Sequence, residues 1–220
     1  MSRKLSVIGT GVIGNGWIAR ALARGWDVVA FDPAPEAPAR TRAFVDNAWA
    51  SLTRQGLAEG ASPARLTFVD GLEAAVAGAD LIQENVPERL DLKREILAAL
   101  DAAAAPEVLI GSSTSGFKPS DLQRDCAKAP GRVIVAHPFN PVYLLPLVEL
   151  VGGEATEPAE VERAAALYRE LEMRPLAVRR EIEGHIADRL MEALWREALH
   201  LVNDGVATTV EVDAAVVYGC

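Results

Sequence analysis

Histidine is the side chain best suited to proton transfer near neutral pH, and the chain contains three histidines. Only His137 ends a predicted strand, over residues 132–137, whereas His185 and His200 fall on a predicted helix. Glu149 lies in the next predicted strand, after a stretch rich in proline. If that stretch reverses the chain, the carboxylate returns beside the imidazole of His137, orients it and stabilises its protonated form. His137 and Glu149 are therefore predicted to act together as a general base.

A run of hydroxyl side chains follows the strand predicted over residues 108–112. It consists of Ser112, Ser113, Thr114 and Ser115. Ligands of open parallel sheets bind at the carboxyl ends of the strands, so a hydroxyl here could bind a substrate oxygen. The same cluster is also typical of a simple polar turn. The chain has no G-x-S-x-G motif, which disfavours a serine hydrolase.

A G-x-G-x-x-G motif follows the first predicted strand and opens a helix. Its residues are Gly9, Thr10, Gly11, Val12, Ile13 and Gly14. Asp32 stands at the end of the second predicted strand, where the dinucleotide-binding fingerprint requires an acidic residue for the adenosine ribose. Its charge would repel a 2′-phosphate, so the sequence favours NAD over NADP.

The elements that position these residues alternate between short apolar strands and amphipathic helices. Strands are predicted over residues 5–9, 27–32, 66–70, 81–86, 108–112, 132–137, 147–151 and 175–179, and helices over 13–24, 39–58, 91–103 and 159–171. This alternation predicts an α/β fold, a Rossmann-type doubly wound and mostly parallel sheet. From Ile182 onwards, apolar residues recur every four positions and Gly205 follows as a C-terminal cap, which predicts a long helix. We therefore expect an NAD-binding domain over residues 1–180 and the start of an all-helical C-terminal domain over 181–220.

Composition excludes several other classes of protein. The net charge of -9 disfavours binding to nucleic acid or to anionic membranes. No apolar run is long enough to span a bilayer, and the first residues do not resemble a signal peptide. The two cysteines, Cys126 and Cys220, lack the spacing of a metal site or a disulfide framework. A cytoplasmic protein without a metal is expected.

Taken in order, five motifs of this chain resemble the L-3-hydroxyacyl-CoA dehydrogenase family. They are residues 9–14, 83–88, 112–115, 137–141 and 147–149. The resemblance covers nearly the whole chain and implies that His137 is the catalytic base, Glu149 its partner, and Ser115 the ligand of the substrate oxygen. It also implies that Asn140 binds near the nicotinamide, and that Glu88 and Lys93 contact the cofactor.

Within the family, the segments 112–117, 137–149 and 186–190 look most like those of members that oxidise a small free acid. The implied reaction is the oxidation of L-carnitine to 3-dehydrocarnitine with NAD. Members that use CoA carry a long lysine-rich hairpin after the second strand, whereas residues 39–66 here contain arginine but no lysine. Family members also continue with further helices that form a homodimer, so this chain is expected to be a fragment or a shortened product.

A trimethylammonium group requires aromatic faces or carboxylates, because it has no N–H to donate. Phe117, Phe139 and Tyr143 flank the motifs and are candidates for such a cage, although each could equally be an ordinary core aromatic. Asp188 stands where the family usually has asparagine. Its carboxylate could face the quaternary ammonium, or it could be a solvated residue at a helix start.

Three alternatives remain open at this stage. The chain could act on another 3-hydroxy acid, such as gulonate or 3-hydroxybutyryl-CoA. It could be a catalytically silent NAD-binding or crystallin-like protein, since the further helices of the family are missing. The apolar stripe over residues 182–201 could also cause aggregation of a chain that does not fold stably.

Overall fold

The computed structural model describes residues 2–219, which divide into two compact units. The first unit ends at Glu183 and the second begins at Gly184.

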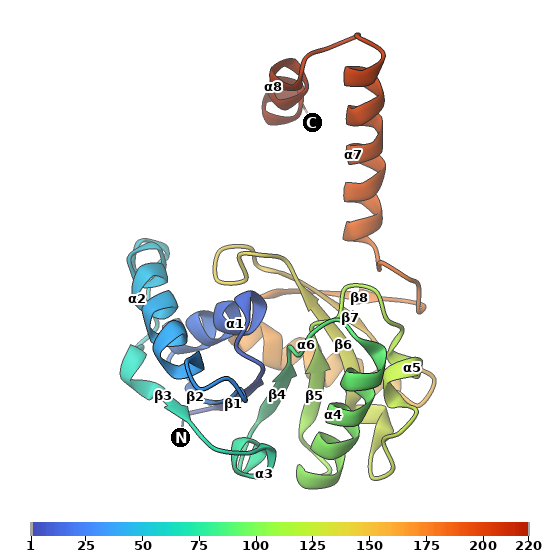
Figure 1. The fold of residues 1–220 in the computed structure, drawn as a ribbon. Helices are drawn as coiled ribbons and strands as arrows, with labels where there is room; N and C mark the ends of the chain where they lie inside the picture. Colours follow the sequence, from blue (N-terminus) through green and yellow to red (C-terminus); the bar gives the residue numbers. More distant parts are fainter. Residues whose placement is uncertain (1, 220) are drawn as a thin grey trace. The chain divides into compact units, whose positions relative to one another are not determined.

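The described part of the first unit is built on a single eight-stranded sheet, with the strand order β3-β2-β1-β4-β5-β6-β7-β8 (Figure 1). The strands are β1 (Lys4–Ile8), β2 (Asp27–Phe31), β3 (Leu66–Phe68), β4 (Leu81–Glu84), β5 (Leu109–Ser112), β6 (Val133–Pro138), β7 (Leu147–Val151) and β8 (Arg174–Val178). All neighbours are parallel except β6 and β7, which are antiparallel. The predicted Rossmann-type, mostly parallel sheet is therefore confirmed.

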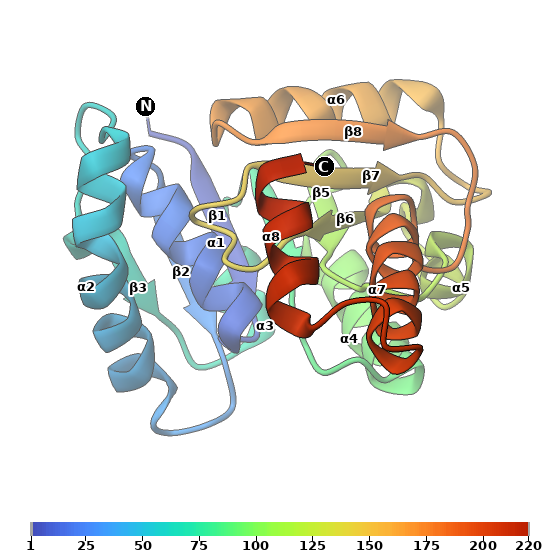
Figure 2. The ribbon, with the colours of Figure 1, turned by 90° about the horizontal axis from the view of Figure 1, so that it is seen from above.

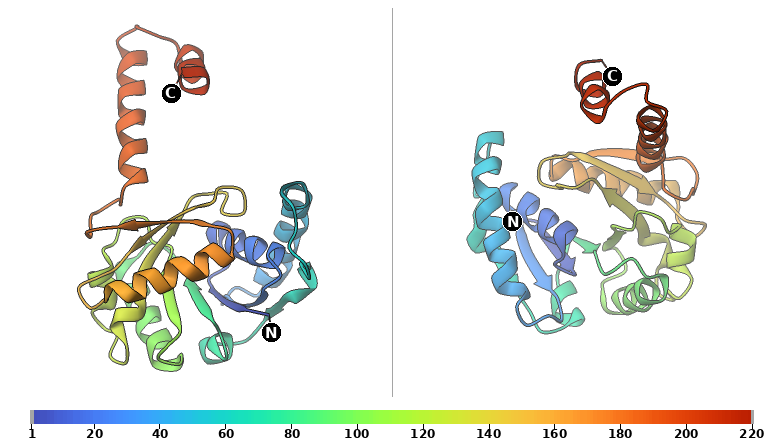
Figure 3. Two further views of the ribbon diagram at one scale, coloured as in Figure 1. Left: turned by 180° about the vertical axis from the view of Figure 1, so that it is seen from behind. Right: turned by 45° about the horizontal axis from the view of Figure 1, so that its top comes forward.

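Helices cover both faces of this sheet. One face packs against α1 (Val12–Ala23), α2 (Ala37–Gln55) and α6 (Pro158–Glu170), and the other against α3 (Leu72–Val76), α4 (Leu90–Ala103) and α5 (Pro119–Gln123). Figure 3 shows α6, in light orange, lying across its face of the sheet.

Each face of the sheet has its own apolar core, and β6 contributes side chains to both cores. Ile134 and Ala136 belong to the cluster under α1 and α6, whereas Val133 and Val135 belong to the cluster under α4. Side chains of a strand alternate between its faces, so a strand buried on both sides must be apolar at nearly every position.

The loop between β6 and β7 lies against the first helix, and Figure 2 shows it, in yellow, passing over α1. A Cβ atom on Gly16 would lie 2.8 Å from the Cβ atom of Val142, so only glycine permits this approach.

The second unit contains α7 (Ala187–Asn203) and α8 (Thr209–Gly219). The prediction that the long helix starts at Ile182 is wrong. Gly184 and His185 have φ angles of 69° and 45°, which an α-helix cannot contain, so the regular turns begin only at Ala187. The predicted end is confirmed, because Gly205 follows the helix with a φ of 69°.

Two helices, α3 and α5, were not predicted. Among the described residues, no helix combines the length and the apolar character that crossing a membrane would require.

Candidate active site

The strand order places β1 and β4 side by side while their connections run to opposite halves of the sheet. The crevice outside the carboxyl ends of such a pair is where open α/β sheets bind their ligands. Four neighbouring strands, β1, β4, β5 and β6, bring their carboxyl ends to this edge.

The glycine motif forms the turn between β1 and α1. Gly9 has a φ of 84°, and a Cβ atom on it would lie 2.8 Å from the carbonyl oxygen of Asn85. A Cβ atom on Gly14 would collide with the carbonyl oxygen of Gly9. Gly11, the N-cap of α1, has open space where its side chain would be and gives the helix no side-chain cap. The first N–H groups of α1 are thus available for an anion, which fits a pyrophosphate.

Asp32 lies beside this turn because the N–H of Gly9 donates to the carbonyl oxygen of Phe31, at 2.9 Å. Its Oδ2 accepts hydrogen bonds from the N–H of Thr10, at 2.7 Å, and from the Thr10 hydroxyl, at 2.9 Å. Its Oδ1 accepts from the N–H of Ala34 at 3.0 Å. Burial acts to raise the pKa of Asp32, but these hydrogen bonds outweigh it and lower the pKa. The carboxylate is therefore charged and fixed where it could accept from ribose hydroxyls.

The two apolar residues of the glycine motif differ in exposure. Val12 is exposed at the start of α1, and Ile13 packs against the core under α1.

His137 and Glu149 face each other directly across the antiparallel pair β6 and β7. The imidazole Nδ1 lies 3.0 Å from the Glu149 Oε2, and both residues are buried. A carboxylate can only accept, so Nδ1 carries the hydrogen and Nε2 is left as the basic nitrogen. The predicted chain reversal between the two strands is confirmed.

The hydroxyl cluster continues from β5 at the same edge. The Ser112 hydroxyl donates to Glu84 Oε2 at 2.5 Å, and the Thr114 hydroxyl donates to Glu88 Oε1. Ser115 is exposed, and its backbone N–H donates to the same Glu88 oxygen at 3.1 Å. Of the four hydroxyl residues, Ser115 is thus the one presented to solvent.

Lys93 and Glu84 form a buried ion pair that the sequence analysis did not anticipate. Lys93 Nζ lies 2.9 Å from Glu84 Oε1, 3.0 Å from the carbonyl oxygen of Val86 and 3.4 Å from Glu88 Oε2. The ammonium thereby holds Glu88, which in turn holds the Ser115 loop. A direct cofactor contact of Lys93 or Glu88 stays a prediction. The available signal for Glu84 was a carboxylate at the end of a short strand predicted to be buried.

The aromatic candidates for a cage do not come together. The Phe139 ring lies 4.9 Å from the His137 ring, edge to face. Tyr143 packs edge-on against Phe44, at 5.8 Å, and joins the core under α1. Phe117 joins the core on the opposite face of the sheet. Phe139 is thus the candidate in contact with the base.

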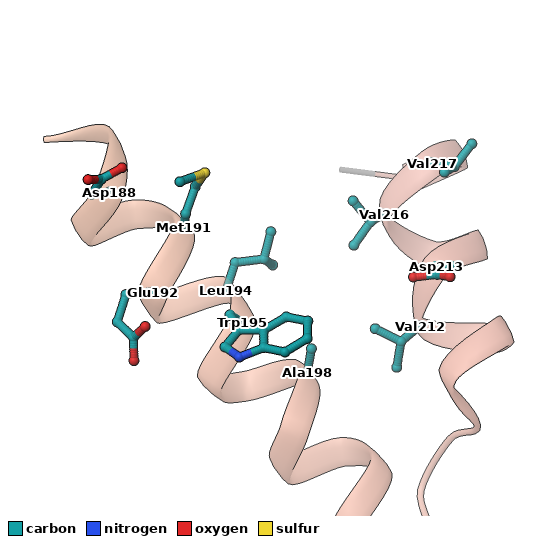
Figure 4. Close-up of a pocket in the computed structure, with 10 residues that line it drawn as sticks. All are labelled: Asp188, Met191, Glu192, Leu194, Trp195, Ala198, Val212, Asp213, Val216 and Val217. Carbon is teal, nitrogen blue, oxygen red and sulfur yellow. The ribbon is translucent and has the colours of Figure 1, made fainter. Parts of the chain in front are cut away.

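The remaining candidates are Asn140 and Asp188. Asn140 is exposed in the loop that follows β6. Asp188 lies in the first turn of α7 and lines a groove between α7 and α8, together with Met191, Trp195 and Val216 (Figure 4). The roles predicted for these two residues stay predictions.

Comparison with known proteins identifies the family of both units of the chain. The family model described as "3-hydroxyacyl-CoA dehydrogenase, NAD binding domain" matches residues 4–182, and the model of the C-terminal domain of the same family matches residues 184–220.

Curated relatives include the L-carnitine dehydrogenases of Bacillus cereus and Pseudomonas aeruginosa, which are 62% and 61% identical to this chain over 217 residues. Those alignments cover 99% of this chain but 66% and 67% of the relatives, so the chain spans about two thirds of their length.

Among solved structures, an NAD+-dependent 5-formyl-3-hydroxy-2-methylpyridine 4-carboxylic acid 5-dehydrogenase superposes with a TM-score of 0.90 at 33% identity, over 100% of this chain and 71% of that one. The (S)-3-hydroxybutyryl-CoA dehydrogenase of Ralstonia eutropha superposes with a TM-score of 0.87 at 28% identity, over 100% and 78%. Because these two family models together match nearly all of its residues, this chain belongs to the 3-hydroxyacyl-CoA dehydrogenase family.

Proposed function

We propose that this chain catalyses the NAD-dependent oxidation of L-carnitine to 3-dehydrocarnitine. The observation that carries the proposal is the buried His137–Glu149 pair at the same sheet edge as the glycine turn and the exposed Ser115. A hydroxyl-bearing carbon held at this edge would meet a base, a hydrogen-bond donor and the cofactor together.

The chemistry is divided among three side chains and the cofactor. The glycine turn and Asp32 would hold NAD, which would supply the acceptor for the hydride of the hydroxyl-bearing carbon. His137 takes the hydroxyl proton on Nε2, because Nδ1 already carries a hydrogen held by Glu149. The Glu149 carboxylate stabilises the imidazolium that results, and the Ser115 hydroxyl donates to the substrate oxygen as it becomes a carbonyl.

Two observations favour carnitine as the substrate in this proposal. The relatives at 61–62% identity are named L-carnitine dehydrogenases. In addition, residues 39–66 offer no lysine for the phosphates of CoA, which favours a small free acid. The same proposal includes a cytoplasmic location.

A parallel assay tests this proposal. NADH formation is measured with L-carnitine, gulonate and 3-hydroxybutyryl-CoA, and we expect turnover with carnitine to exceed that with the other two. NADH binding without turnover on any of the three would instead favour a silent NAD-binding protein.

Substitution of the base tests the mechanism. His137→Gln is expected to lower kcat by about 100- to 10,000-fold, because it removes the general base, while NADH binding stays near that of the wild type. His200→Gln is the matched control, since His200 is exposed on α7. Equal turnover in the two variants would contradict the assignment of His137.

A further inference from the structure

A buried glutamine in β4 joins the two strands that carry the proposed catalytic groups. Gln83 is completely buried. Its Nε2 donates to the hydroxyl of Ser113, at 2.8 Å, and to the carbonyl oxygen of Ala136, at 3.3 Å. Its Oε1 accepts from the hydroxyl of Tyr168, at 2.5 Å. A carbonyl oxygen can only accept, so the amide NH2 must face β6 and its oxygen must face the phenol.

This side chain reaches across β5, and the strand is built to let it pass. Gln83 pairs with Gly111, the residue of β5 that lies between it and β6. A Cβ atom on Gly111 would lie 2.9 Å from Gln83 Oε1 and 2.9 Å from the Cβ atom of Ala136, and it would collide with the Tyr168 hydroxyl. Any other residue at position 111 would therefore displace the amide.

Two of the three partners of Gln83 lie shortly before the proposed catalytic residues in the sequence. Ser113 stands two residues before Ser115, and Ala136 directly before His137. The hydroxyl of Ser113 donates to Asn85 Oδ1, at 2.8 Å, and accepts from an indole N–H of α1. With one donated and two accepted bonds, its hydrogen-bonding capacity is filled, which fixes the start of the loop.

We infer that Gln83 is a positioning residue that sets the spacing between the imidazole of His137 and the hydroxyl of Ser115. The inference rests on the proposed function. Both groups must reach one substrate oxygen at the same time, and a misplacement of about 1 Å can reduce turnover by about 100-fold. One amide bonded to both segments fixes their separation.

The test compares two buried glutamines. Gln83→Met keeps the length of the side chain but removes its hydrogen bonds. Gln123→Met is the matched control, because the amide of Gln123 also donates to β6, at the carbonyl oxygen of Val133 at 2.8 Å, but at the start of the strand. We expect both variants to lose thermal stability and to retain NADH affinity within about twofold.

Only Gln83→Met should lower kcat with carnitine, by about 10- to 100-fold, and raise the primary isotope effect with carnitine deuterated at the hydroxyl-bearing carbon. Misplaced groups slow the chemical step itself, whereas a general loss of stability leaves the isotope effect unchanged. Equal losses of kcat in the two variants would overturn the inference.

A second measurement needs no substrate. Hydrogen exchange of the NADH complex should be faster in Gln83→Met than in the wild type over residues 113–118 and 136–140, and unchanged over residues 9–14.

The failure of the proposed function and the failure of this inference give different results. Wild-type protein that does not oxidise carnitine would contradict the proposed function, whereas unchanged hydrogen exchange in Gln83→Met would contradict the role of Gln83. If Gln83→Met does not fold, Ser113→Ala takes its place, and wild-type rates and exchange in that variant overturn the inference.

Discussion

Four hydroxyl groups follow one another at the end of β5, yet each has different surroundings. Ser112 bonds to a buried carboxylate, Ser113 fills its capacity with three partners, and Thr114 bonds to Glu88. Ser115 alone among the four is exposed. The sequence could identify the cluster, but not which of its members is exposed, because that depends on carboxylates and amides from β4 and from the loop that follows it.

The difference between Ser112 and Ser115 can be measured. Ser115→Ala is expected to lower kcat/KM for carnitine about 10-fold, since one hydrogen bond to the substrate oxygen is lost, with little change in stability. Ser112→Ala is expected to lower the free energy of unfolding by about 1–3 kcal/mol, because an oxygen of Glu84 is left buried without this donor. Kinetics and urea unfolding of both variants give the comparison, and a stability loss confined to Ser115→Ala would contradict it.

Asp32 should decide the choice between NAD and NADP. Asp32→Asn removes the charge that repels a 2′-phosphate and weakens the hydrogen bonds to the ribose. We expect the Kd for NADH to rise by about 10- to 100-fold, which corresponds to about 1.5–3 kcal/mol, and the Kd for NADPH to fall. Asp46→Asn, at an exposed position on α2, is the control. A fluorescence titration that finds both cofactors unaffected by Asp32→Asn would rule out this role.

The periodicity of apolar residues in the sequence predicts the longer helices and the strands of the sheet. It does not predict very short helices or a strained backbone. The Rossmann-type sheet and the pairing of His137 with Glu149 were predictable, because apolar strands alternate with helices and prolines mark the reversal. The helices α3 and α5 have five residues each, too few for a 3.6-residue period to register. Ile182 and Ile186 continue the spacing of α7, but the backbone at Gly184 and His185 breaks the helix before it starts.

A buried carboxylate at the end of α4 bonds to the segment that leads into β6. Asp101 accepts hydrogen bonds from the N–H of Lys128, at 2.7 Å, from that of Ala129, at 3.0 Å, and from the guanidinium of Arg132, at 2.9 Å. Burial acts to raise the pKa of Asp101, but these bonds outweigh it and lower the pKa. The stabilisation is therefore fully present above the unfolded pKa of about 3.9, and it is lost as the pH falls through the lower folded value.

Asp101→Asn is expected to lower the free energy of unfolding at neutral pH by about 3–5 kcal/mol, because Arg132 is left buried without its partner. The variant should also lose the part of the acid dependence that comes from this carboxyl. Urea unfolding at a series of pH values from neutral to acid gives both quantities. Parallel stability curves for the variant and the wild type would show that Asp101 is not the titrating group.

At the scale of the whole molecule, the two units differ in how they bury apolar surface. The first unit contains both core clusters, whereas none of the described side chains of α7 and α8 is buried. Leu190 is 67% exposed, Leu194 is 50% exposed and Trp195 is 63% exposed. Hydrophobic stabilisation scales with the apolar area removed from water, so these helices add little of it to the chain.

Truncation after Glu183 should therefore leave a folded protein. Its thermal midpoint is expected to stay within about 4 °C of that of residues 1–220, which corresponds to about 1 kcal/mol for a domain of this size. NADH affinity should be retained, because the glycine turn and Asp32 lie in the first unit. Light scattering should show more self-association for the longer chain, since contiguous exposed apolar surface promotes contact between copies. A truncated protein that unfolds or loses NADH would mean that the segment from Gly184 onwards supports the cofactor domain after all.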